Sequence, residues 1–269
     1  MSFAVDGSVA VITGATRGIG RQIAFRLGRA GARLVVVGRT GSDDPDAVLP
    51  GSLPEVVAAL GDEGIEARSV QANLTSPDDT SRIVDRTLEW YGGCDILVNN
   101  AGYTSNGPII DVPASRWERA FRVQVVGPLQ LCQGLVPGML ERGSGRVLSV
   151  SSGSATAISP NLSLYSTSKQ AMERWNASMH LELGGRGVAF NVLRVDHIVS
   201  TEGWWHVYNT QGAEIATGGA GLETLKTPEY TAECADWMIR QPDGWSGHVV
   251  GFDDLTDLGG PEPGPPAVQ

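Results

Sequence analysis

The chain has 269 residues, which is enough for one large α/β domain or two small ones. Its net charge of −10 argues against nonspecific attraction to nucleic acid or to an anionic membrane surface. No segment approaches the roughly 18 consecutive apolar residues that span a bilayer, and the first residues lack the basic and apolar regions of a signal peptide. We therefore expect no nucleic-acid partner and no membrane partner.

Three cysteines, Cys94, Cys132 and Cys234, lie far apart and lack the spacing of a metal site. The four histidines are equally scattered along the chain. We therefore predict no metal site. The cysteines are interpreted as buried or incidental thiols of a protein in a reducing compartment, so the predicted location is cytoplasmic.

Apolar segments and turn residues predict an alternation of strands and helices. Strands are predicted at residues 9–13, 34–37, 67–71, 95–98, 146–150, 188–195 and 248–252. Helices are predicted at residues 21–30, 53–62, 77–91, 114–142 and 163–184, the fourth of them interrupted by Gly127, Pro128 and Pro137. Most strands are apolar on both faces, which indicates a parallel sheet with helices on both sides. We predict one α/β domain over residues 1–255, then a flexible Gly- and Pro-rich tail at 256–269.

A glycine-rich turn joins the first strand to the first helix, with glycines at Gly14, Gly18 and Gly20. Without a Cβ atom the backbone can turn tightly and approach a pyrophosphate, and the helix N-terminus supplies free N–H groups. The alternative is a tight loop without a ligand. The strand–turn–helix setting favours dinucleotide binding.

The end of the second strand bears on the choice of cofactor. An NAD site usually has an acidic residue there, whereas this chain has Arg39, and Arg17 lies in the glycine turn. Two guanidinium groups can pair with a 2′-phosphate, so we predict that NADP(H) is preferred and that NAD(H) is possible. The alternative is that each arginine is a solvated surface charge. Asp43 and Asp44 would oppose a phosphate if they folded inward.

Tyr165 and Lys169 are four residues apart and therefore share one face of a helix. An ammonium group beside a phenol favours the phenolate, so Lys169 is predicted to lower the pKa of Tyr165. Such a tyrosine donates or accepts a proton near neutral pH. A serine, Ser152, stands thirteen residues before the tyrosine.

Four segments together resemble the classical short-chain dehydrogenase/reductase family: residues 13–20, 99–102, 149–152 and 165–169. The resemblance extends from about Val5 to Phe252. It implies a single Rossmann-type domain with a sheet of seven parallel strands, and a homodimer or homotetramer. The implied activity is hydride transfer between NADP(H) and a carbonyl or secondary alcohol substrate.

The resemblance also implies a role for each matching residue. Tyr165 is the general acid/base, Lys169 lowers its pKa and holds the nicotinamide ribose, and Ser152 orients the substrate oxygen. Ser151 is the competitor for that last role, but the interval to Tyr165 favours Ser152. The full set of expected cofactor-binding residues is Gly14, Thr16, Arg17, Gly18, Ile19, Gly20, Arg39, Thr40, Asn73, Leu74, Asn100, Ala101, Gly102, Tyr165, Lys169 and Ser200.

The chain departs from the family pattern at several positions. Gln124 stands where the family often has an asparagine that anchors a water, which relays protons from the lysine. We therefore include Gln124 among the catalytic candidates, and we expect this proton relay to be rewired or absent. The alternative is that it merely fills helix space. Val195 and Asp196 replace the usual Pro-Gly pair, and Asn73 stands where an aspartate often contacts the adenine ring. Asp254 replaces a glycine near the last strand.

Loops beyond the carboxyl ends of the strands are expected to form the substrate pocket. Residues 200–228 contain two tryptophans and a glycine-rich stretch, which suits a lid over a neutral, partly hydrophobic substrate. The alternative is that these tryptophans pack against the domain or a second subunit. Two other functions stay open: an enzyme of the same fold with a non-redox outcome, such as an epimerase or dehydratase, and a non-catalytic dinucleotide-binding protein.

Overall fold

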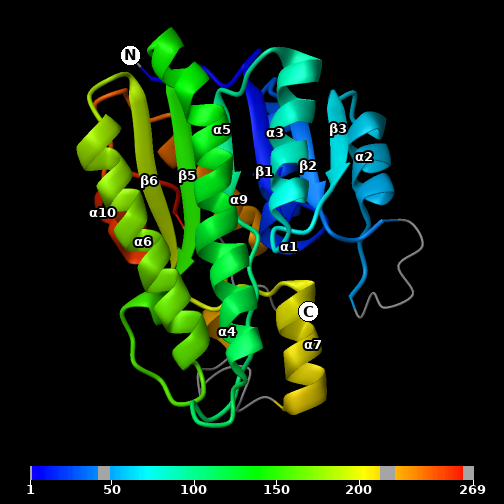
Figure 1. Cartoon of the computed structure of the whole chain (residues 1–269), viewed down its shortest axis with the longest axis vertical. Coiled ribbons are helices and arrows are strands. Elements are labelled where there is room, and N and C mark those ends of the chain that lie inside the picture. The colour runs from blue at the N-terminus through cyan, green and yellow to red at the C-terminus, as the bar shows by residue number, and fades with distance from the viewer. Residues whose placement is uncertain (1, 42–48, 213–221, 263–269) are drawn as a thin grey trace.

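Seven parallel strands form one sheet in the order β3-β2-β1-β4-β5-β6-β7. A computed structural model describes residues 2–41, 49–212 and 222–262 (Figure 1). The strands are β1 (Val9–Thr13), β2 (Arg33–Gly38), β3 (Ala67–Gln71), β4 (Ile96–Asn99), β5 (Gly145–Ser152), β6 (Val188–Val195) and β7 (Val249–Gly251). The chain order reverses between β1 and β4, which creates the crevice where ligands of such sheets bind. The predicted α/β fold is confirmed.

Helices cover both faces of the sheet, as expected for parallel strands that are buried on both sides (Figure 1). The helices are α1 (Gly18–Arg29), α2 (Leu53–Asp62), α3 (Pro77–Tyr91), α4 (Ala114–Phe121), α5 (Gly127–Arg142), α6 (Ser163–Leu183), α7 (Glu202–Gln211), α9 (Pro228–Ile239) and α10 (Phe252–Asp257). Apolar side chains of α1, α2 and α9 pack on one face, and those of α3, α5 and α6 pack on the other.

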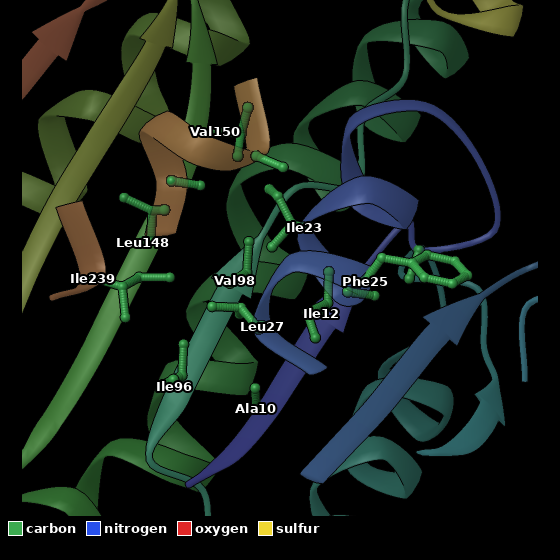
Figure 2. Packing of buried hydrophobic residues seen from close by; sticks show 14 of the residues in the cluster. Ala10, Ile12, Ile23, Phe25, Leu27, Ile96, Val98, Leu148, Val150 and Ile239 are labelled. Atoms are coloured by element: carbon green, nitrogen blue, oxygen red, sulfur yellow. The ribbon is translucent and has the colours of Figure 1, made fainter. Parts of the chain in front are cut away.

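The core between the central strands and α1 is apolar and closed to solvent. Ala10, Ile12, Ile96 and Val98 point from β1 and β4 toward α1 (Figure 2). Each of them is fully buried, so their transfer from water contributes to the stability of the sheet centre. The glycine turn is thereby built on a fully buried part of the sheet.

The helix predicted over residues 114–142 is divided in two by a π-helical turn at Arg122–Val126. Gly127 donates its backbone N–H to the carbonyl oxygen of Arg122, which is the hydrogen-bond spacing of a π-helix. Pro128 has no N–H and therefore cannot bond the carbonyl of Gln124 as an α-helix requires. The irregular turn buries the Gln124 side chain completely.

The carboxyl end of the chain contains a helix that the sequence pattern did not predict. The last strand is shorter than expected, and α10 begins directly after it at Phe252 and extends through Asp257. Regular structure therefore continues beyond the predicted domain boundary at residue 255. The remainder of the predicted tail from 263 onward, Asp43 and Asp44, and the glycine-rich stretch of the predicted lid fall outside the described residues. None of the described helices is long and apolar enough to cross a membrane.

Candidate active site

The turns after β1 and β4 are joined at the carboxyl edge of the sheet. The Asn100 side chain donates from Nδ2 to the carbonyl oxygens of Thr13 (2.9 Å) and Gly14 (3.2 Å). The Thr13 hydroxyl in turn accepts the backbone N–H groups of Asn100 and Ala101. These bonds satisfy buried polar groups and hold the glycine turn against the second turn. The two predicted cofactor segments therefore form one surface.

Close packing explains why two positions in the turn are glycines. A Cβ atom on Gly20 would lie 2.3 Å from the carbonyl oxygen of Gly14 and 2.4 Å from Asn100 Nδ2. Gly14 itself has φ of 67°, a left-handed conformation that other residues adopt at a cost. The backbone of this turn is thus available for close approach by a ligand.

A cavity of about 380 Å³ opens beside the turn. Ten of the predicted cofactor residues line it: Gly14, Thr16, Arg17, Arg39, Thr40, Asn73, Leu74, Asn100, Ala101 and Gly102. The predicted residues Gly18, Ile19 and Gly20 lie next to it in the first turn of α1. A bare glycine turn at a helix N-terminus fits the pyrophosphate of a dinucleotide. These residues would bind the adenosine half and the pyrophosphate.

The two predicted arginines lie close enough for their charges to interact. Burial lowers the pKa of Arg17, Glu202 raises it, and the Arg39 guanidinium lowers it further. Arg17 donates from Nη2 to the Thr40 hydroxyl (3.2 Å) and to the Gly51 carbonyl oxygen (3.4 Å). Two neighbouring guanidinium groups can pair with an anion such as a phosphate. Arg39 is exposed at the mouth of the cavity.

Glu202 is a functional candidate that the sequence pattern did not single out. Its Oε2 atom accepts the backbone N–H of Gly18 at 3.0 Å, and it acts on the charge of Arg17. The carboxylate therefore occupies the N-terminus of α1, the place where such turns bind a phosphate. Glu202 begins α7, so this bond joins the predicted lid to the glycine turn. The contact spans 184 residues, which is why no local motif reveals it.

Ser152, Tyr165 and Lys169 come together at the end of β5. The Ser152 hydroxyl acts on the pKa of the Tyr165 phenol, and Lys169 Nζ lies 5.7 Å from the centre of the Tyr165 ring. Lys169 Nζ donates to the carbonyl oxygen of Val150 at 2.7 Å. The Ser151 hydroxyl is buried and does not take part in this group. The geometry thus favours Ser152 over its competitor.

The pKa of Tyr165 is shifted in the direction opposite to the sequence prediction. Burial raises the pKa of Tyr165, and the Ser152 side chain lowers it by less. The prediction that Lys169 brings the pKa below its ordinary value is therefore wrong for the arrangement seen here. Burial also lowers the pKa of Lys169 to about 8, against the opposing effect of Glu173. The desolvation of both groups outweighs their proximity.

Gln124 connects the cofactor turn to the helix that carries Tyr165. Its Oε1 atom accepts the backbone N–H of Tyr103 at 3.0 Å, and its Nε2 atom donates to the Ser168 hydroxyl. Ser168 in turn donates to the Tyr165 carbonyl oxygen at 2.8 Å. Both ends of the amide are therefore engaged. In this arrangement Gln124 contacts Ser168 and not Lys169, so its catalytic role stays a prediction.

The unusual loop after β6 has a structural explanation. Asp196 Oδ1 accepts the backbone N–H of Phe252, and Asp254 Oδ2 accepts that of Gly251, each at 3.0 Å. The two acids that replace family glycines thus cap α10. The predicted cofactor residue Ser200 donates its hydroxyl to the Lys226 carbonyl oxygen at 3.3 Å, at the base of the segment that carries α7.

Aromatic residues gather on α7, which lies beyond the carboxyl edge of the sheet (Figure 1). Trp204 and Trp205 pack edge to face at a centroid distance of 4.7 Å, and Tyr208 contacts both rings. All three are partly exposed. These rings follow Glu202 on α7, and Glu202 contacts the glycine turn.

A doubly wound parallel sheet, a glycine turn and a cavity at the strand-order reversal define a dinucleotide-binding protein of the Rossmann type. The model of the short chain dehydrogenase family matches residues 8–211. The chain therefore belongs to the short-chain dehydrogenase/reductase family of oxidoreductases, as predicted, and has its NAD(P)-binding Rossmann fold.

Individual relatives differ in substrate. Versicolorin reductase stcU of Emericella nidulans is 29% identical over 238 residues, which cover 88% of this chain and 83% of that protein. The L-sorbose reductase of Gluconobacter frateurii, solved with NADPH and L-sorbose, superposes with a TM-score of 0.82 at 26% identity and covers 94% of this chain and 98% of its own. A 7 alpha-hydroxysteroid dehydrogenase, solved with NADH and 7-oxo glycochenodeoxycholic acid, has a TM-score of 0.80 at 28% identity, covering 92% and 93%.

Proposed function

We propose that the protein is an NADP(H)-dependent oxidoreductase that interconverts a carbonyl group and a secondary alcohol. The observation that carries this proposal is the meeting of Ser152, Tyr165 and Lys169 at the edge of the sheet that also bears the glycine turn. Hydride transfer is the chemistry that a bound nicotinamide supplies. The protein then has to orient the substrate and exchange one proton with its oxygen.

The three side chains divide this work. Ser152 positions the reacting oxygen by a hydrogen bond, and the Tyr165 hydroxyl donates or accepts the proton at that oxygen. Lys169 is placed to stabilise negative charge on the phenol and to hold ribose hydroxyls. A raised pKa keeps the Tyr165 phenol protonated at neutral pH, which suits proton donation to a carbonyl oxygen.

The cofactor preference rests on the two arginines of the cavity. The adjacent charges of Arg17 and Arg39 support recognition of the 2′-phosphate of NADP(H). The aromatic surface on α7 supports a neutral, partly hydrophobic substrate. A homodimer or homotetramer in the cytoplasm remains our expectation for the protein in the cell.

Arg39→Ala is expected to weaken NADPH binding selectively, because Arg39 is the exposed member of the pair and its side chain has no hydrogen bond to the residues that the structure describes. We expect the Kd for NADPH to rise by about tenfold, the effect of one charge-assisted bond, while the Kd for NADH stays nearly constant. Nicotinamide fluorescence measures both constants. Equal affinities of the unaltered protein for NADPH and NADH would contradict the phosphate site while leaving the oxidoreductase intact.

Glu202→Gln is expected to strengthen NADPH binding several-fold. The substitution keeps the shape of the side chain but removes a negative charge from the N-terminus of α1 and from Arg17. Glu229→Gln, a change of the same kind in the first turn of α9, is the matched control. The same fluorescence titration applies, and an unchanged or weaker affinity would show that the carboxylate does not compete with the cofactor.

A panel of ketones and secondary alcohols tests the reaction itself. Change of absorbance at the nicotinamide band, coupled to product formation, is the expected result. Product without any net change at that band would indicate a non-redox reaction. Tight NADPH binding without any product across the panel would indicate a binding protein and overturn the proposal.

A further inference from the structure

The cavity beside the glycine turn contains a third arginine that the proposed function does not use. Arg119 of α4 lines this cavity together with Arg17 and Arg39. No aspartate or glutamate is among the described residues that line it, although the chain as a whole has a net charge of −10. The cavity wall is therefore cationic within a strongly acidic protein.

Arg119 reaches the cavity from a different side than Arg39. Arg39 directly follows β2, whereas Arg119 lies on α4, the first helix after β4. The strand β1 lies between β2 and β4, so the ends of these two strands are about 10 Å apart. A ligand in the crevice therefore has cationic groups on two of its sides.

A contact with an aromatic ring, rather than an ion pair, supports the Arg119 side chain. Its guanidinium carbon lies 5.5 Å from the centre of the Tyr103 ring, and the backbone N–H of Tyr103 is bonded to Gln124. A guanidinium group over a ring keeps its full charge. In the described part of the chain no carboxylate pairs with Arg119, whereas Arg142, for example, pairs with Asp95. The charge of Arg119 is thus available to an anion that comes from solution.

A positive cavity matters because the chain as a whole repels an incoming phosphate. The net charge of −10 acts against a dinucleotide at long range. Charges inside a cleft concentrate an oppositely charged ligand there and raise its association rate by about 10- to 1000-fold. Glu202 partly offsets the charge of Arg17, so Arg39 and Arg119 supply much of this attraction.

We propose that Arg119 is a steering residue for the cofactor, whose charge draws the phosphates of the dinucleotide into the cavity and speeds their association. The inference rests on the proposed function, because it takes NADP(H) as the ligand. Arg119 is exposed, and an exposed charge at the rim of a site acts mainly on the association rate and on its dependence on salt. The lifetime of the complex should depend on it little.

Stopped-flow measurement of nicotinamide fluorescence gives kon and koff for NADPH and tests this role. In Arg119→Gln, kon should fall by about three- to tenfold at about 20 mM salt, and koff should change by less than about twofold. The difference in kon should vanish at about 1 M salt, where charges are screened within about 3 Å. Arg119→Lys keeps the charge without the planar group, so it should keep most of the association rate.

The matched control is Arg186→Gln, which removes the same charge at an exposed position. Arg186 lies just before β6, at the edge of the sheet opposite the cavity, so kon should stay nearly the same. An equal fall of kon in this control would mean that only the net charge matters, and it would overturn the proposal. An unchanged kon in Arg119→Gln would overturn it too.

Two further outcomes separate steering from other roles of Arg119. A rise of koff without a fall of kon would mean that Arg119 contacts the bound cofactor instead of guiding it, and a loss in Arg119→Lys as large as in Arg119→Gln would point to shape instead of charge. Either result would contradict steering while leaving the cofactor site intact. The measurement needs no turnover, so it stands even if the ketone panel gives no product. A chain that binds neither NADPH nor NADH would overturn the cofactor site, and the role of Arg119 with it.

Discussion

Replacing Tyr165 with phenylalanine is expected to lower kcat by about 10²- to 10⁴-fold, which is the contribution of a positioned acid or base. The variant removes one oxygen atom from a ring that stays in place, because Tyr165 lies within a regular helix and its backbone is bonded to Ser168. The ring contact with Lys169 does not need the hydroxyl. NADPH affinity should therefore stay nearly the same.

The control is Tyr91→Phe, which makes the same chemical change at the end of α3. That helix ends near the start of β4, at the edge of the sheet opposite the cavity. Steady-state kinetics and a nicotinamide titration of both variants separate turnover from binding. Retained turnover in Tyr165→Phe would remove the tyrosine from the mechanism. A parallel loss of NADPH affinity would mean that the substitution had disturbed the cofactor site instead.

The parts of this molecule that were predictable are those encoded by local patterns. Continuous apolar segments mark the buried strands such as β1 and β6, since a strand covered by helices on both faces has no polar side. The glycine turn is equally local, because Gly14 and Gly20 are needed where the chain folds tightly on itself. Tyr165 and Lys169 are found from their spacing on one helix.

What sequence alone did not reveal depends on contacts between distant residues. Glu202 bonds Gly18 across 184 positions, and Asp196 caps a helix that begins 56 residues later. The short α10 is stabilised by such a cap and by the burial of Phe252 and Leu255 in the core. The pKa of Tyr165 was predicted in the wrong direction for the same reason: spacing shows the neighbouring charge, but burial appears only when the chain is folded.

The Gly20→Ala variant should be less stable and should bind NADPH at least tenfold more weakly. Alanine normally favours a helix over glycine by about 1 kcal/mol, and Gly20 lies in the first turn of α1. Here the added methyl group would lie 2.3 Å from the Gly14 carbonyl oxygen, inside contact distance of backbone atoms that Asn100 holds in place. Overpacking of this kind costs about 1–3 kcal/mol, so the clash outweighs the helix preference.

Gly61→Ala on α2 is the matched control, because nothing lies within 4 Å of the position that its Cβ atom would take. The same substitution should there raise the free energy of unfolding by up to about 1 kcal/mol. Denaturant unfolding of both variants measures the two effects, and a nicotinamide titration measures binding. The free energy of unfolding is expected to fall in Gly20→Ala and to rise in Gly61→Ala. A Gly20→Ala protein as stable as the original, with unchanged NADPH affinity, would mean that the turn accommodates a side chain and that close approach of the backbone is not what selects glycine at this position.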